Sequence, residues 1–181
     1  MTAPLPPPRR LFLKGLCLPA AMAMPLWARA AATGPRELAL DHTHTGERIR
    51  QAYALGPQYL PEGLDRLNVF LRDHYSGEVG LMDPLLFEQL YRVRTLLGAR
   101  MSYQVISGYR SPATNERLRL GRAGGVASRS LHMDGRAIDV RLPGVPLAEL
   151  RDAALSLQAG GVGYYPAEQF VHLDTGRVRR W

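Results

Sequence analysis

Alternation of apolar and polar residues marks the first predicted strands of this chain. It runs through Glu37–His44, stops at a Thr45-Gly46 turn and resumes through Glu47–Tyr53. Side chains two apart on a strand point to the same face, so each segment offers one apolar face to a core. We therefore expect two strands joined by a tight turn.

Helix-like and strand-like segments then follow one another to the end of the chain. Four segments are expected to be helices: Pro61–His74, a segment from the Asp83 cap to Gly98, Ala113–Leu120 and Leu147–Leu157. Four short apolar segments are expected to be strands: Ser102–Ser107, Arg136–Leu142, Gly160–Tyr164 and Gln169–Leu173. The polar, glycine-rich segment Gly121–Ser130 predicts a loop. This order predicts an α+β fold in which helices flank a small antiparallel sheet.

The first thirty residues differ in character from the rest. Basic residues precede an apolar run that ends at Trp27, and Ala28-Arg29-Ala30 supplies a small-x-small cleavage site. The run is too short and too interrupted for the roughly 20 apolar residues of a membrane span. The segment Arg9–Lys14 (Arg-Arg-Leu-Phe-Leu-Lys) resembles the twin-arginine export motif. We expect residues 1–30 to be a signal peptide, residues 31–181 to be one domain exported to the periplasm, and no stable membrane anchor to remain after signal removal.

Loss of residues 1–30 would change the charge of the protein. The whole chain has 23 basic and 16 acidic residues, a net charge of +7, and four of the basic residues but none of the acidic ones lie in the first thirty. The remaining excess of three positive charges argues against a nucleic-acid partner and suits an acidic polymer. The single cysteine, Cys17, would also be removed. A metal site in the domain must therefore be built from His, Asp and Glu.

Two histidines and an aspartate in the C-terminal half are candidate metal ligands. His132 and Asp139 lie seven residues apart, with Gly135 between them to permit a bend, and His172 follows past a predicted helix. Two imidazoles and a carboxylate are the donors of a catalytic zinc site that leaves one position to water. Spacing alone also allows a hydrogen-bonded histidine and a turn-capping aspartate. His42 and His44 would share a strand face, but no third ligand is evident, so we assign no second site.

The motifs around these residues resemble a known family. Residues 130–139, Ser-x-His-x-x-Gly-x-Ala-x-Asp, with a late histidine, resemble the zinc peptidases that include D-alanyl-D-alanine carboxypeptidases and dipeptidases, whose fold is shared with the hedgehog signalling domain. A closer resemblance, from about Leu40 to Trp181, is to the murein endopeptidase K family. It is carried by Ile106–Pro112, Ser130–Met133, Gly160–Pro166 and Phe170–Gly176. The resemblance implies one Zn²⁺ per chain, held by His132, Asp139 and His172, and hydrolysis of peptide cross-links in murein.

The general base of such a reaction does not carry over from the resemblance. Related peptidases place an acid three residues before the last histidine ligand, or a histidine two before it, but Gln169 and Phe170 stand there. Asp174 shares the strand face of His172, and we expect it to be the base, with Glu168 as the less favoured candidate. The alternative for Asp174 is to orient an imidazole without handling the proton.

Arg110 lies in a turn where related dipeptidases keep an arginine near the substrate. A permanently charged guanidinium can polarise the scissile carbonyl or bind a peptide carboxylate, although an ordinary surface arginine is the alternative. Tyr164, Tyr165 and Trp181 either wall a peptide cleft or pack against the sheet. Two other functions stay open: a D-alanyl-D-alanine carboxypeptidase or dipeptidase, and a non-catalytic, zinc-stabilised murein-binding module.

Overall fold

A computed structural model describes residues 34–121 and 127–181, so the expected signal peptide, residues 1–30, lies outside the described residues. The helices are α2 (Pro61–Phe70), α3 (Pro84–Leu96), α4 (Pro112–Gly121), α5 (Leu147–Ser156) and the short 3-10 helix η1 (Leu131–Asp134). The strands are β1 (Pro35–His42), β2 (Arg48–Leu55), β3 (Gln58–Tyr59), β4 (Tyr103–Ser107), β5 (Ala137–Arg141), β6 (Gly161–Tyr165), β7 (Phe170–Asp174) and β8 (Arg179–Arg180). Within these ranges, no helix has both the length and the hydropathy needed to cross a membrane.

The strands form one eight-stranded mixed sheet in the order β3-β2-β1-β4-β5-β7-β6-β8. The expectation of an antiparallel sheet is wrong for two of the strand pairs. Strand β1 pairs with β4 in parallel, and β6 pairs with β8 in parallel. The edge strands β3 and β8 have two residues each, too few to show an alternating pattern. The parallel pairing needs a long crossover, which α2 and α3 supply, and hydropathy along the chain does not determine how such a crossover closes.

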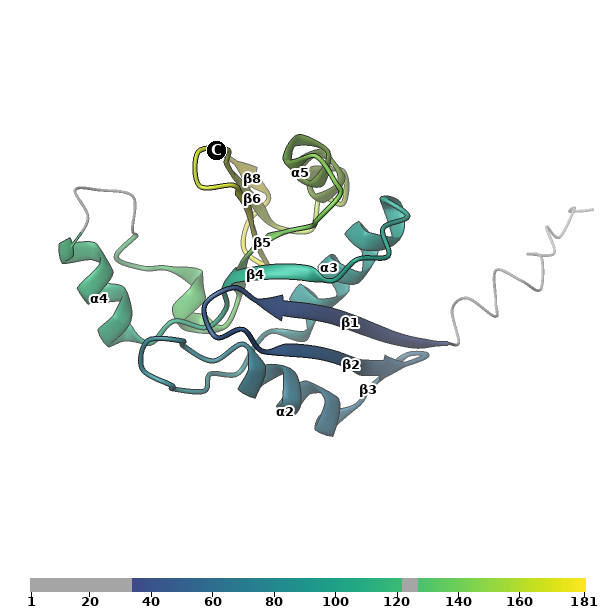
Figure 1. Ribbon diagram of the computed structural model, residues 1–181, viewed down its shortest axis with the longest axis horizontal. Coiled ribbons are helices and arrows are strands. Elements are labelled where there is room, and N and C mark those ends of the chain that lie inside the picture. The colour runs from purple at the N-terminus through teal and green to yellow at the C-terminus, as the bar shows by residue number, and fades with distance from the viewer. Residues whose placement is uncertain (1–33, 122–126) are drawn as a thin grey trace, which may run out of the picture.

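Three helices bury the apolar side of the sheet, and α4 does not. Helix α2 packs on β2, α3 packs on β1 and α5, and α5 packs on β6 and β7. Their leucines meet the strand residues in one core, in which the hydroxyls of Tyr53 and Tyr103 donate to the backbone carbonyls of Phe87 and Leu90. Helix α4 lies at the opposite side of the molecule from α5 (Figure 1), and its buried residues are the polar Thr114 and Asn115. It is therefore placed to border a surface site.

The first helix ends earlier than the leucine spacing predicts. Helix α2 stops at Phe70 rather than His74. The side chain of Asp73 accepts hydrogen bonds from the backbone N–H groups of Tyr75 and Ser76, at 2.9 and 3.4 Å. Such local bonds offer the backbone an alternative to the helix and turn the chain out of it. The segment that follows α2 therefore leaves the helix axis and lies near the start of α4.

The register of the central strands aligns polar residues across the sheet. Asp139 of β5 lies opposite Ser107 of β4 on one side and opposite His172 of β7 on the other. A slip of one residue in either pairing would send one of these side chains to the other face. The fold thus fixes which polar groups meet.

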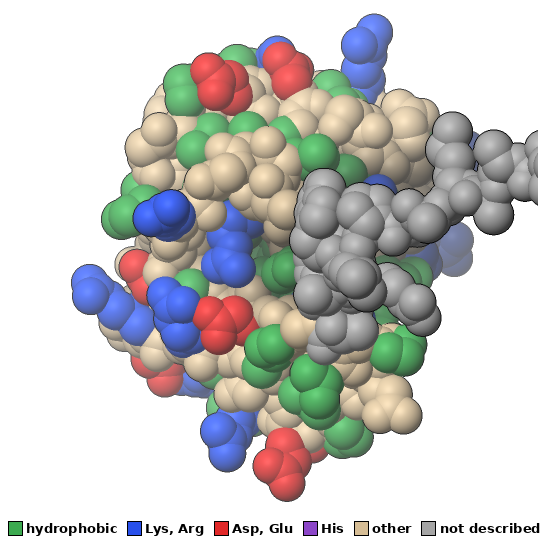
Figure 2. All heavy atoms as spheres, turned by 90° about the vertical axis from the view of Figure 1, so that its right-hand side faces the viewer, with side chains coloured by type: hydrophobic (Ala, Val, Ile, Leu, Met, Phe, Trp, Pro, Cys, Tyr) green, Lys and Arg blue, Asp and Glu red, His purple; other side chains and the backbone are tan. Residues whose placement is uncertain are grey.

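The face shown in Figure 2 carries arginine side chains interspersed with acidic and hydrophobic ones, and no histidine is visible there among the described residues. Charges of both signs are mixed on this face, which is unlike the single-sign stripe of a nucleic-acid interface.

Substitution of Gly135 tests how the fold positions His132. It ends η1 with φ of +65°, and a Cβ added there would overlap the carbonyl oxygen of Leu81. Because left-handed strain and overpacking add, Gly135→Ala should lower the free energy of unfolding by about 2–5 kcal/mol. The matched variant Gly46→Ala has φ of +72° and open space around it, so it should cost about 1 kcal/mol. Denaturant unfolding measures both, and equal losses would contradict this account.

Candidate metal centre

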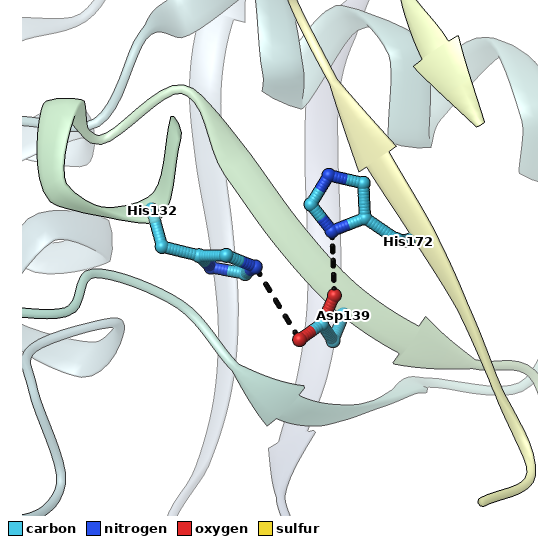
Figure 3. Close-up of side chains that lie close together, drawn as sticks. All are labelled: His132, Asp139 and His172. Atoms are coloured by element: carbon cyan, nitrogen blue, oxygen red, sulfur yellow. Dashed lines mark hydrogen bonds and ion pairs between the residues drawn. The ribbon is translucent and has the colours of Figure 1, made fainter. Parts of the chain in front are cut away.

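Three side chains from separate elements converge at the centre of the sheet (Figure 3). His132 comes from η1, Asp139 from β5 and His172 from β7. The Nε2 atom of His132 lies 3.3 Å from Oδ2 of Asp139, and Nδ1 of His172 lies 2.8 Å from Oδ1 of the same carboxylate. The three donor atoms lie within 4.8 Å of one another. These separations bracket the roughly 3.3 Å between donors of a tetrahedral zinc site.

The outer nitrogen of each imidazole is held by an oxygen atom. Nδ1 of His132 lies 2.7 Å from the carbonyl oxygen of Gly108 and donates to it, which directs Nε2 toward Asp139. Nε2 of His172 lies 3.3 Å from Oδ2 of Asp174. Metal-binding histidines characteristically donate their other N–H in this way. The nitrogen and oxygen donors, and their outer partners, fit a divalent transition metal such as zinc.

The cluster combines a charged carboxylate with a protonated imidazole. Burial acts to raise the pKa of Asp139, but the neighbouring His132 and His172 outweigh it and hold the pKa well below its usual range. Burial acts to lower the pKa of His172, but the hydrogen bonds with Asp139 and Asp174 prevail and raise the pKa to about 9. A cation bound among these groups would take the place of the proton between His172 and Asp139.

Asp139 and Asp174 contact opposite edges of the His172 ring, Asp139 at Nδ1 and Asp174 at Nε2. The carboxylate of Asp174 is fully buried and also accepts hydrogen bonds from the backbone N–H groups of Gly161 and Gly176, at 3.0 and 2.7 Å. The guanidinium of Arg179 pairs with it at 2.7 Å. Burial acts to raise its pKa, yet these bonds and His172 keep the pKa of Asp174 well below its usual range. A carboxylate so satisfied is a poor proton acceptor, so the geometry favours the alternative, in which Asp174 orients His172.

Glu168 and Arg110 border the same cleft as Asp139. This cleft has a volume of about 240 Å³ and runs from the centre of the sheet to the segment after α2. The guanidinium of Arg110 lies 4.0 Å from Oδ2 of Asp139 and 3.4 Å from both Oγ of Ser107 and Oδ1 of Asn115. Glu168 is exposed in the turn between β6 and β7. Both side chains are thus available to a substrate in the cleft.

The three aromatic residues for which the sequence allows either a cleft wall or packing against the sheet make different contacts. The Tyr165 ring stacks on Phe170 at 4.5 Å, and its hydroxyl accepts a hydrogen bond from Nε1 of Trp181 at 2.7 Å. The Trp181 ring lies 5.3 Å from His172. Tyr164 lies under the guanidinium of Arg151, in a second cavity that Trp181 also lines. Trp181 therefore borders the candidate centre, Tyr165 supports it through its hydroxyl, and Tyr164 packs against Arg151.

Sequence reasoning missed two groups that hold the centre in place. The carbonyl of Gly108 fixes His132, and Arg179 neutralises Asp174. A backbone carbonyl has no sequence signature. Arg179 stands among three arginines near the end of the chain, and its spacing from Asp174 does not single it out.

Comparison with known proteins gives a consistent picture. The family model described as peptidoglycan L,D-endopeptidase MepK matches residues 30–181. The proteins named peptidoglycan L,D-endopeptidase MepK in Escherichia coli K12 and Shigella flexneri are each 47% identical over 172 residues, covering 94% of both chains. A Haemophilus influenzae protein, named a probable peptidoglycan L,D-endopeptidase MepK, is 44% identical over 148 residues, covering 81% of this chain and 79% of its own. No solved structure matches.

Replacing Asp174 distinguishes a positioning role from a base. Asp174→Asn keeps the shape but removes the charge that holds Arg179 and His172, so zinc affinity should fall by about 10- to 100-fold. The control Asp152→Asn breaks an exposed pair with Arg151 and should leave the affinity unchanged. Competition titration with a zinc-binding dye measures both. Unaltered affinity of the Asp174 variant would contradict the positioning role.

Proposed function

Because this chain belongs to the peptidoglycan L,D-endopeptidase MepK family, which makes it a peptidase of bacterial murein, we propose that it is a zinc-dependent enzyme cutting peptide cross-links in the cell wall. The observation that supports a zinc site is the pairing of Asp139 with His172 across β5 and β7, with His132 as the third member of the group. We further propose that the domain has the hedgehog and D-alanyl-D-alanine peptidase fold and holds one ion per chain.

The metal would be held by Nε2 of His132, the carboxylate of Asp139 and Nδ1 of His172. When bound, zinc supplies Lewis-acid chemistry, making water acidic enough to attack near neutral pH and polarising a carbonyl. Asp174 and the Gly108 carbonyl keep the two imidazole rings in their binding orientation. The chain contributes the positioning, and the substrate enters along the cleft.

Glu168 is the proposed general base. It lines the same cleft as Asp139, its side chain is exposed, and no ion pair with it is found among the described residues. A carboxylate there can take a proton from the attacking water and return it to the departing amine. In this proposal Glu168 has the role of general base that the strand pattern predicted for Asp174.

Arg110 is the proposed stabiliser of the developing oxyanion. Its guanidinium is fixed near Asp139 by Ser107 and Asn115, so its charge faces the reacting carbonyl without needing to reorganise. The same group could pair with a substrate carboxylate, as a planar fork of N–H donors does.

We propose that this activity operates in the periplasm. The support is the composition of residues 1–30, with the twin-arginine-like Arg9–Lys14 segment and the Ala28-Arg29-Ala30 cleavage site. The substrate, murein, also lies outside the cytoplasmic membrane. Secretion of a reporter fused to residues 1–30 would test the export.

Digestion of isolated, cross-linked murein tests the proposed function. The zinc-loaded protein should convert cross-linked dimers to monomers, and stripping the metal or introducing His132→Ala should abolish the conversion, because the ligand set is then incomplete. Chromatography with mass spectrometry separates the products. Loss of one terminal D-alanine from monomers would instead indicate a carboxypeptidase. Co-sedimentation with murein without any release would indicate a binding module.

Glu168→Gln tests the base directly. The amide keeps the size but cannot take a proton, so turnover should fall by about 10²- to 10⁴-fold. Zinc affinity should stay unchanged, in contrast to Asp174→Asn. The exposed Glu116, paired with Arg119 on α4, gives the control Glu116→Gln, which should keep full turnover. Full turnover in the Glu168 variant would remove it from the mechanism.

A further inference from the structure

Four stacked side chains from three separate segments form one wall beside the cleft. The imidazole of His44, in the turn after β1, lies parallel to that of His74 at 4.3 Å. The ring of Tyr75 lies 4.2 Å from His74, and the guanidinium of Arg117, on α4, lies 4.5 Å from Tyr75. We call His44, His74, Tyr75 and Arg117 the stacked wall. Its first three members line the cleft that also contains Asp139 and Arg110.

Buried His42 supports this wall from behind. Its Nδ1 accepts the backbone N–H groups of His44 and Thr45, at 3.2 and 3.4 Å, which fixes the turn that carries His44. Its ring meets His74 edge-on at 5.5 Å. Burial, with the neighbouring His74 and His44, lowers the pKa of His42 to about 4, so the ring is neutral at neutral pH.

The tautomer of His42 rules out a second metal centre in this group. A neutral imidazole whose Nδ1 accepts hydrogen bonds carries its proton on Nε2 and has no lone pair left for a cation. His44 and His74 alone do not complete a ligand set. The histidines of the stacked wall therefore need another explanation than metal binding.

The stacked wall is held at a fixed position relative to Arg110. Asp73, next to His74, accepts the backbone N–H of Tyr75 with one carboxylate oxygen. With the other it accepts the N–H and hydroxyl of Ser111, at 2.9 and 2.7 Å, at the start of α4. One buried carboxylate thus ties the segment after α2 to the turn that carries Arg110. The wall and the reaction centre share a scaffold.

The chemistry of the wall suits an acidic peptide. Tyr75 is 51% exposed, although a large aromatic side chain gains by burial. Arg110 brings a positive charge to the lining of the cleft, and Arg117 brings a second one to the ring of Tyr75. Stem peptides of murein combine short aliphatic side chains with free carboxylates. An endopeptidase must hold such a peptide on each side of the bond that it cuts.

We propose that the stacked wall binds one of the two stem peptides of the cross-link, with Tyr75 and His44 contacting its apolar and amide groups and Arg117 pairing with one of its carboxylates. This inference rests on the proposed function, since it assigns a subsite to the same cleft. Selectivity for cross-linked substrate follows, because a monomeric peptide cannot occupy the stacked wall and the other side of the scissile bond at once.

Calorimetric titration of the metal-free protein with a soluble cross-linked peptide dimer excised from murein tests the subsite without turnover. Tyr75→Ala should weaken binding about fivefold and Arg117→Ala about threefold, whereas Tyr75→Phe should keep the wild-type affinity. Tyr59→Ala, on the edge strand β3, and Arg119→Ala, two residues along α4 from Arg117, are matched controls that should not change it. Thermal unfolding confirms that each variant is folded.

A dimer with amidated carboxylates separates charge recognition from stacking. Arg117→Ala should leave its affinity unchanged, and Tyr75→Ala should still weaken it. Wall variants that bind both dimers as the wild type does would overturn the inference, even if the zinc-loaded protein cuts murein. Weakened binding by these variants, with a zinc-loaded wild type that cuts nothing, would sustain the subsite and overturn the proposed function.

Discussion

The pairing of Asp139 with His172 across β5 and β7 is the constraint on which the rest of the structure depends. It places a carboxylate and an imidazole 2.8 Å apart on one face of a sheet whose register cannot slip without exchanging apolar and polar faces. His132 joins them only because η1 ends at Gly135 and turns the chain back into β5. Ser107, opposite Asp139 on β4, extends the same row toward Arg110. A backbone ladder, rather than flexible loops, thus defines the centre.

Such a centre is costly to bury, and the surrounding groups offset the cost. Asp174 is compensated by Arg179 and two backbone N–H groups, and His132 by the carbonyl of Gly108. Removing one partner would leave a buried charge or donor unsatisfied, which destabilises more than the pair itself stabilises. The same network turns both imidazoles toward one point. Stability and the geometry of the candidate metal centre therefore depend on the same hydrogen bonds.

The sequence brings together the three candidate ligands and predicts most strands and helices, because hydropathy spacing and motif chemistry act locally. It predicts less where distant segments meet. The two-residue edge strands and the parallel β1–β4 pairing depend on tertiary closure. The same-face rule correctly brings Asp174 to His172, but only the rotation of the ring decides that it contacts the outer nitrogen. The stacked wall joins positions 44, 74, 75 and 117, and no local pattern relates them.

A crystal structure of the zinc-loaded protein, with anomalous data collected on either side of the zinc absorption edge, tests the central claim most directly. The account expects one peak per chain, about 2.0–2.2 Å from Nε2 of His132, a carboxylate oxygen of Asp139 and Nδ1 of His172, with Asp174 still on Nε2 of His172. A peak bound elsewhere, or one that leaves out Asp139 or either histidine, would contradict it.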